Sequence, residues 1–246
     1  MPMPNGSGGG DGGEARGGAI YSNATTNPRI VDCVFTDCSA IGGIGGTGGD
    51  GADASGEESP AGAGGNGGDY GDAYGGAIYC GVSSTPEIDR CSVENSISQA
   101  WAYYDPAHGI IGGPGGEGGE GEDPNPDGPD GDDGDPGFAY GGGIVLDRSS
   151  VSSINDTFVQ ENEVVEYTLD VIPEPNTSEI SVFNTRGGLG GGVYCDSQVM
   201  LSISEGTALT GNTAHGDGGG LYCLESGSIN IDDSVIKENQ SIKGDG

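Results

Sequence analysis

An acidic stretch between residues 123 and 135 has the residue types and spacing of a calcium-binding loop. Its first half, Asp123-x-Asn125-x-Asp127-Gly128, puts oxygen-bearing side chains at alternate positions before a glycine. The twelfth position is a glycine, so the bidentate glutamate of a helix-flanked calcium loop is missing. A solvated acidic turn is the alternative. The calcium ligands that we expect are Asp123, Asn125, Asp127, Asp130, Asp132, Asp133 and Asp135.

Cysteines recur at equivalent places in the chain. Cys33 and Cys91 share one position of successive repeats, which are described below, and Cys195 and Cys223 share another. Stacked repeats bring such residues within the Cα–Cα range of a disulfide. A free thiol is also a good small core residue. The sequence therefore leaves two alternatives, a pair of disulfides or a ladder of buried thiols, and it contains no Cys-x-x-Cys pair that would indicate zinc.

Four tyrosines also recur, at the end of the glycine motif that marks each repeat. If the branched residue before each tyrosine points inward, the tyrosine points outward. Such a column could stack against sugar rings of a glycan or pack against neighbouring inserts. The column consists of Tyr21, Tyr79, Tyr194 and Tyr222.

A few acidic and basic side chains are candidate catalysts. Asp147 and Asp196 recur in neighbouring repeats, and paired carboxylates can hydrolyse glycosidic bonds. The chain has 39 acids, so one such pair is expected by chance. Arg90 and Arg148 are the candidate bases of a polysaccharide lyase, and neither lies in a supporting motif. We therefore predict a protein that is not an enzyme.

The charge excludes one large class of partners. Seven basic residues against 39 acidic ones give a net charge of −32. Phosphate contacts need lysine and arginine, so nucleic-acid binding is excluded and binding to an anionic membrane is disfavoured. No apolar run reaches the length of a membrane span, so no membrane insertion is expected.

The elements that position these residues are five copies of one glycine motif. Each copy has two glycines, a small residue, a branched apolar residue, and Tyr or Val, and short β-branched segments bounded by Gly, Ser and Asp follow it. Strand, turn and strand of this length make one coil of a parallel β-helix, with equivalent residues about 4.8 Å apart. The copies are Gly17–Tyr21, Gly75–Tyr79, Gly141–Val145, Gly190–Tyr194 and Gly218–Tyr222.

Stacked coils predict three further features. The glycine pairs lie where the backbone needs a positive φ or where two chains approach closely. One column should be an inward aliphatic ladder: Ile20, Ile78, Ile144, Val193 and Leu221. Another should be an amide ladder at a bend, since asparagine tolerates the left-handed conformation: Asn95, Asn162, Asn212 and Asn239.

The motifs carry a family resemblance. Gly-Gly-Ala-Ile at residues 17–20 and 75–78, with looser Phe-x-x-Asn segments downstream, resembles the repeat pair of polymorphic outer membrane proteins. In the second element Cys38 replaces the asparagine, the spacing from Val93 to Asn95 is short, and that from Phe158 to Asn162 is long. The resemblance implies a right-handed parallel β-helix and an adhesin-like module of a bacterial surface protein.

Long inserts interrupt the repeats. Those at residues 1–16, 40–74 and 109–139 have glycine at every third position, a period typical of polyproline II. They resemble the Gly-Gly-x arms of polyproline II bundle proteins and are expected to form hairpins on one side of the coils. A flexible linker is the alternative. The insert at 163–189 reads as a β-hairpin around Pro173–Asn176 or as a lobe on the coil.

The sequence thus predicts an all-β chain. We expect residues 1–246 to be one right-handed parallel β-helix segment of about five coils, part of a longer repeat array. The expected function is a non-enzymatic structural or adhesive module, extracellular and stiffened by calcium. Its expected partners are neighbouring repeats or copies of itself, stacked end to end, and a glycan or other cell-surface ligand. The alternative is a polysaccharide-binding or polysaccharide-degrading β-helix.

Overall fold

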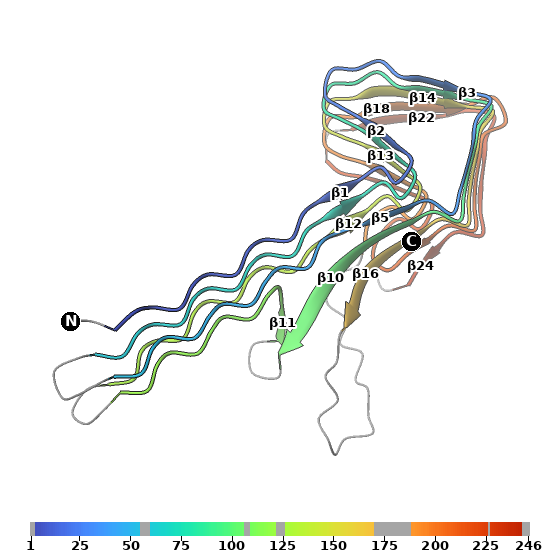
Figure 1. Ribbon diagram of the computed structural model, residues 1–246. Helices are drawn as coiled ribbons and strands as arrows, with labels where there is room; N and C mark the ends of the chain where they lie inside the picture. The colour runs from blue at the N-terminus through green and yellow to red at the C-terminus, as the bar shows by residue number, and fades with distance from the viewer. Residues whose placement is uncertain are drawn as a thin grey trace.

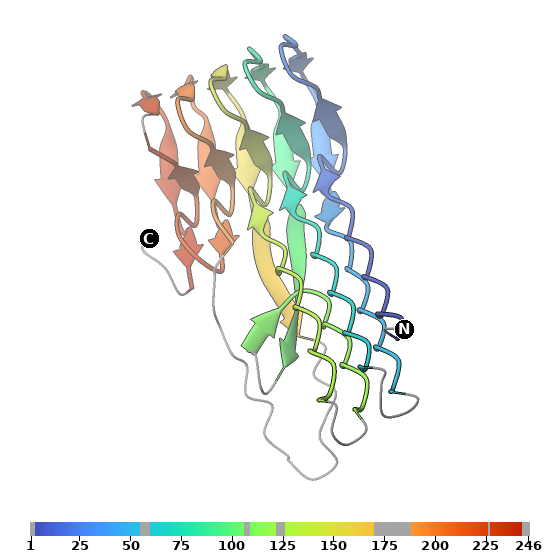
Figure 2. The same cartoon turned by 90° about the vertical axis from the view of Figure 1, so that its left-hand side faces the viewer.

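The computed structural model describes residues 3–54, 60–105, 109–121, 126–169, 188–225 and 227–242. All regular elements among these residues are β-strands. They stack in five rungs, and long glycine-rich arms extend from one corner of the first three (Figures 1 and 2). The predicted all-β fold of stacked parallel strands is confirmed.

Each rung contributes one strand to each of four parallel sheets. The first sheet holds β2 (Ile20–Ser22), β7 (Ile78–Cys80), β13 (Ile144–Leu146), β17 (Val193–Cys195) and β21 (Leu221–Cys223). The second holds β3 (Arg29–Val31), β8 (Glu87–Asp89), β14 (Val151–Asn155), β18 (Met200–Ser204) and β22 (Ser228–Ile231). The third holds β4 (Val34–Thr36), β9 (Ser92–Glu94), β15 (Phe158–Gln160), β19 (Ala208–Thr210) and β23 (Val235–Lys237).

The fourth sheet lies where the arms begin. It holds β5 (Ser39–Ile41), β10 (Ile97–Asp105), β16 (Glu163–Leu169), β20 (Thr213–Ala214) and β24 (Gln240–Ser241). A hairpin strand, β11 (Gly109–Ile111), pairs antiparallel with β10. A small parallel sheet precedes the glycine motifs and consists of β1 (Ala15–Arg16), β6 (Ala73–Tyr74) and β12 (Ala139–Tyr140).

The two glycines of each motif have different tasks. The first has a positive φ in every copy, for example 61° at Gly17 and 64° at Gly75. At the second, the end of the same rung passes so close that a side chain has no room. A Cβ on Gly76 would overlap the carbonyl of Gly142 and lie 2.6 Å from the backbone of Ile97. Both predicted reasons for glycine therefore hold, one at each position.

The inside of the stack is a continuous apolar column. The predicted aliphatic ladder is confirmed, because Ile78, Ile144 and Val193 pair in register and are fully buried. Ile20 and Leu221, on the two end rungs, are partly buried against the same cluster. A thin core of this kind is consistent with a chain that is only 32% apolar.

The amide ladder exists, with one member different from the prediction. Asn212 donates from Nδ2 to the carbonyl of Val159 at 2.8 Å and to Oδ1 of Asn239 at 2.9 Å. Its own Oδ1 accepts from Nδ2 of Asn162 at 3.0 Å. The prediction for Asn95 was wrong: this residue is exposed with a φ of 50°, and Ser96 takes the ladder position.

The cause is the register of the third sheet. Val159 pairs with Val93 and is buried, whereas Phe158 is 49% exposed. Counted from Val93 and Val159, the ladder residue is three positions downstream in both rungs, at Ser96 and Asn162. The irregular spacings in the sequence therefore come from choosing Phe158 and Asn95 as the repeat residues.

The glycine-rich inserts form five extended arms that lie side by side (Figures 1 and 2). Arm 1 (3–14), arm 3 (60–72) and arm 5 (126–138) lead into the glycine motifs, and arm 2 (42–54) and arm 4 (112–121) leave the fourth sheet. Backbone hydrogen bonds join each arm to its neighbours. Gly65 donates to the carbonyl of Gly49 and Gly64 to that of Pro129, at 2.8 and 2.9 Å.

Side chains of Asp and Asn complete the hydrogen bonding of the arms. Oδ1 of Asp11 accepts from the N–H of Asp69 at 3.1 Å, and Oδ1 of Asp69 accepts from the N–H of Asp135 at 2.8 Å. Asp50 accepts in the same way from the N–H of Glu117 at 3.1 Å. Many of the acidic residues therefore satisfy backbone donors that the glycine carbonyls do not reach.

Parts of the predicted inserts lie outside the described residues. They are residues 55–59 of the insert at 40–74, residues 122–125 of the insert at 109–139, and residues 170–187 of the insert at 163–189. The first segment of the insert at 163–189 is β16, which lies in the fourth sheet and pairs in parallel with β10 and β20.

Gly68 and Gly10 occupy equivalent positions of arms 3 and 1 and give a matched test of arm packing. A Cβ on Gly68 would overlap the carbonyl of Gly10, whereas a Cβ on Gly10 would meet nothing within 4 Å. We expect Gly68→Ala to lower the free energy of unfolding by about 1 to 3 kcal/mol. Gly10→Ala should change it by less than about 0.5 kcal/mol. Urea denaturation measures both, and equal effects would contradict the packing.

The amide ladder gives a second test. Asn212→Ala removes a fully buried side chain, so that the buried backbone N–H of Asn162 loses its acceptor and the carbonyl of Val159 loses the Nδ2 donor. We expect a loss of about 2 to 4 kcal/mol in the free energy of unfolding. Asn95→Gly is the control and should be neutral, because Asn95 is exposed and left-handed. A comparable loss in the control would show that Asn95 belongs to the ladder.

Candidate functional site

The tyrosine column faces a second aromatic column at the base of the arms. The predicted register is correct: Tyr21 pairs with Tyr79, and Tyr194 with Tyr222. Tyr79 and Tyr194 are only 6% exposed, because Tyr74 of β6, Tyr140 of β12 and Leu189 pack against them. Of the two predicted uses of the column, packing against the inserts accounts for most of its surface. Tyr21, at 52%, keeps a largely exposed ring.

Six tyrosine rings form an unbroken chain across the rungs. The order is Tyr21, Tyr79, Tyr74, Tyr140, Tyr194 and Tyr222, with neighbouring ring centroids 5.0 to 6.0 Å apart. Three of the five contacts lie within one column, and the other two cross between the two columns. Such stacked and edge-on pairs stabilise a structure beyond the area they bury.

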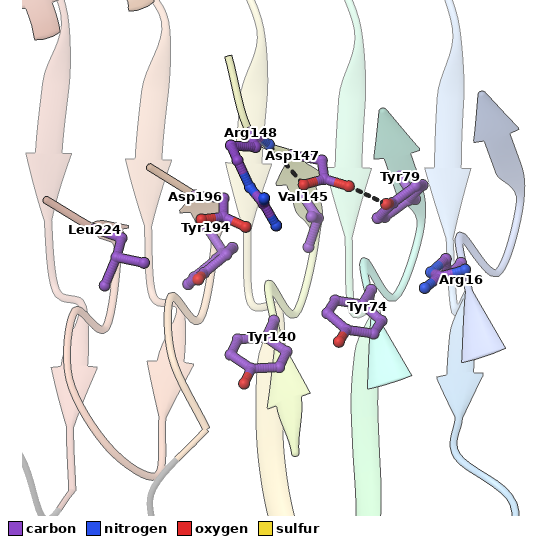
Figure 3. A pocket seen from close by; sticks show the side chains of 10 residues that line it. All are labelled: Arg16, Tyr74, Tyr79, Tyr140, Val145, Asp147, Arg148, Tyr194, Asp196 and Leu224. Atoms are coloured by element: carbon purple, nitrogen blue, oxygen red, sulfur yellow. Dashed lines mark hydrogen bonds between the residues drawn. The ribbon is translucent and has the colours of Figure 1, made fainter. Parts of the chain in front are cut away.

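The chain crosses between columns because one ring is missing. On the third rung Val145 occupies the position that tyrosine holds on the other four. The smaller side chain leaves a notch between Tyr79 and Tyr194, with Tyr74 and Tyr140 as its floor (Figure 3). We call this cavity, of about 250 Å³, the Val145 notch.

Charged residues line the mouth of the notch. Asp147 accepts hydrogen bonds from the hydroxyl of Tyr79 and from the backbone N–H of Arg148, the latter at 2.6 Å. Asp196 lies on the side of Tyr194, and Arg148 hangs over Val145 between the two carboxylates (Figure 3). Arg16, at the far end, stacks 5.3 Å from the ring centre of Tyr74.

Arg148 differs from the other described basic residues. Arg16, Arg29, Arg90 and Lys237 each form an ion pair. Arg148 forms none with any residue that the structure describes, and its side chain is exposed. In a chain with 39 acids, a guanidinium without a carboxylate partner at the mouth of a cavity is a free set of hydrogen-bond donors.

Burial changes the titration of the groups in and beneath the notch. It raises the pKa of Tyr79 well above the ordinary value, and the bond to Asp147 adds to the shift. Burial first, and then the bond to Asp72, likewise raise the pKa of Tyr74. The pKa of Tyr194 rises through burial and the nearby charge of Asp196. All three phenols are therefore neutral donors at physiological pH.

The six cysteines are free thiols in the structure. Cys33 and Cys91 occupy equivalent positions of neighbouring rungs, and Cys195 pairs in register with Cys223. Sγ of Cys91 donates to the carbonyls of Asp89 and Ile30, at 3.2 and 3.5 Å. Cys91 and Cys195 are buried and Cys33 and Cys223 are partly buried, and the choice between disulfides and a thiol ladder stays a prediction.

The predicted calcium loop is only partly within the described residues. Asp123 and Asn125 lie outside them. Oδ1 of Asp127, Asp130 and Asp133 accepts from the N–H groups of Gly121, Gly118 and Gly115, each at 2.8 Å. Asp132 and Asp135 donate their own N–H groups to side chains of arm 3. In the described part of the chain, no three His, Cys, Asp or Glu side chains converge on a point where a metal ion could bind. Calcium binding stays a prediction.

The chain matches no protein-family model, no curated protein and no solved structure. The family resemblance of the glycine motifs therefore stays an expectation. Among the residues that the structure describes, there is no helix with the length and apolar character to span a membrane.

Raised pKa values make stability fall at alkaline pH. Burial raises the pKa of Cys80 from about 9 to about 12. The unfolded state therefore loses this proton near pH 9, while the folded state keeps it until about pH 12. Over that interval the free energy of unfolding should fall by up to about 1.4 kcal/mol per pH unit for this thiol alone. The buried tyrosines act in the same direction above pH 10.

Urea denaturation at pH 8 and pH 10.5 measures this fall. Cys80→Ser is the control, because Ser22 holds the equivalent position in the first rung. The variant should show a smaller loss between the two pH values. A wild-type stability that is constant over this range would contradict the burial of the thiol.

Proposed function

We propose that the protein is a non-enzymatic structural and adhesive module at the surface of a bacterial cell. In this proposal the five rungs close into a right-handed parallel β-helix, and the arms are a polyproline II bundle that braces it. The proposal includes extracellular location, as the glycine-motif resemblance implies.

The observation that carries the proposal is the use of the acidic side chains. Asp11, Asp50 and Asp69 accept backbone N–H groups of a neighbouring arm. Asp127 and Asp130 do the same within the last hairpin. These carboxylates join one arm to the next, so the conspicuous composition of the chain supports rigidity rather than a reaction.

The last rung of the stack supports assembly. Among the described residues, no strand pairs with the outer side of β22 or β23. Their apolar residues are exposed to about the same degree: Ile229 39%, Ile231 44%, Val235 47% and Ile236 46%. An open strand edge with apolar side chains is a template for pairing with another strand. A further repeat or a second copy of the chain, stacked end to end, would cover this edge.

Calcium is part of the proposal only as a stiffening ligand of residues 123–135. The arms do not need it for hydrogen bonding, because the backbone donors named above are satisfied by protein oxygens. The arms should therefore stay ordered in EDTA.

Sedimentation velocity over a series of concentrations, in calcium and in EDTA, tests the assembly. We expect association to increase with concentration and Ile236→Lys to weaken it at least tenfold, since the charge would be buried between two rungs. Phe158→Lys is the matched control, because Phe158 is equally exposed in the middle of the stack. Thermal melting verifies that both variants fold. A monomer at all concentrations, or equal effects of the two variants, would overturn end-to-end stacking.

The second candidate function is recognition of a polysaccharide. A single feature favours it, the combination of aromatic rings, carboxylates and a free guanidinium at the Val145 notch.

A further inference from the structure

We propose that the Val145 notch binds one neutral sugar ring of a surface glycan, through two adjacent hydroxyl groups. The inference deepens the adhesive part of the proposed function and rests on it. It gives that function a ligand class and a place on the molecule.

The shape of the notch suits a single ring. Its volume of about 250 Å³ lies below the roughly 300 to 1,000 Å³ of pockets for drug-sized ligands. Its walls come from three rungs, with Tyr79, Tyr194 and Arg148 around the opening and Val145 at the back. Val145 is 1% exposed and Tyr79 and Tyr194 are 6% exposed. One sugar unit therefore enters the mouth of the notch above Val145, with its carbon–hydrogen face against the partly exposed rings of Tyr74 and Tyr140.

The polar groups at the mouth of the notch offer both the hydrogen-bond donors and the acceptors that two adjacent hydroxyl groups need. The guanidinium of Arg148 supplies donors that no described carboxylate uses. Oδ1 of Asp196 accepts from the N–H of Ser197, and Oδ2 has no hydrogen-bond partner among the described residues. Asp147 has further lone pairs beyond its two bonds. A hydroxyl group both donates and accepts, so adjacent hydroxyls can bond a carboxylate and a guanidinium together.

The charge balance selects a neutral ligand. The notch has two carboxylates, Asp147 and Asp196, and two guanidinium groups, Arg148 and Arg16, the second of which is paired with Glu14 outside the notch. A quaternary ammonium ion would gain from the tyrosine faces but would lie beside the two arginines. An acidic sugar would meet both carboxylates and the field of a chain with net charge −32. A neutral sugar has neither penalty.

The variant Val145→Tyr closes the notch with a residue that the fold already accepts. Tyrosine occupies the equivalent position on four rungs, and in two pairs its rings stack at 5.5 and 5.8 Å. The new ring should therefore fit between Tyr79 and Tyr194 and leave the melting temperature equal or higher. Val151→Tyr, on the same rung, is the matched control, because Val151 is 46% exposed and does not line the notch.

Saturation-transfer NMR and calorimetry with the methyl glycosides of glucose, mannose and galactose test the proposal. We expect at least one of them to bind the wild-type chain and the Val151→Tyr variant equally. Val145→Tyr should weaken this binding at least tenfold and Arg148→Gln at least threefold. Tetramethylammonium and methyl galacturonate should bind more weakly than the neutral glycoside.

Three results would overturn the inference. They are no saturation transfer from any neutral glycoside, binding that survives Val145→Tyr, and tighter binding of either charged probe. Sedimentation separates this failure from that of the proposed function: if stacking persists without sugar binding, only the sugar inference fails. If the chain neither stacks nor binds a sugar, the structural and adhesive proposal fails as well.

Discussion

The close crossing of the backbone at the second glycine of each motif is the constraint on which the structure depends. At Gly18, Gly76 and Gly142 the end of the rung passes across its beginning, and any Cβ would overlap backbone atoms of the same rung or the next. The crossing returns the chain to its starting corner after 21 or 22 residues, as from Gly18 to Ser39 or Gly191 to Thr213. It also fixes where an insert can leave without disturbing the sheets. Rung geometry, arm position and the tyrosine columns all follow from it.

The arms show how a chain with little apolar surface can still be ordered. Burial of hydrocarbon contributes little there, since two of three positions in many triplets are glycine. Order comes instead from close backbone approach and from hydrogen bonds between neighbouring arms. Gly68 donates to the carbonyl of Gly46, and the next N–H, of Asp69, donates to the carboxylate of Asp11. Acidic residues that face the backbone of a neighbouring arm thus accept its N–H groups. From composition alone, the same residues would be expected to face solvent or to bind cations.

The sequence predicted the position of a residue correctly where the residue recurs at a constant spacing from the glycine motif. The inward ladder through Ile78 and Ile144 could be predicted because its spacing from the glycine motif is constant. Asn95 was misplaced because an exposed left-handed turn and a buried amide ladder both favour asparagine, and only the strand register separates them. Tyr74 and Tyr140 were missed although both stand just before a glycine pair, a recurrence that could have revealed them. The notch itself forms where the two tyrosine columns meet in space. The spacing of residues along the sequence does not predict that contact.

The arms brace the stack unevenly. They connect to the first three rungs, while in the described part of the chain rungs four and five carry no arm and are held by their sheets and side-chain ladders. In a repeat protein each unit is stabilised by its nearest neighbours, so extra bonds between some neighbours make the energy uneven along the axis. The rungs should therefore unfold in a fixed order, from the carboxyl-terminal end toward the arms. The Val145 notch lies on the third rung, which is the last one connected to an arm.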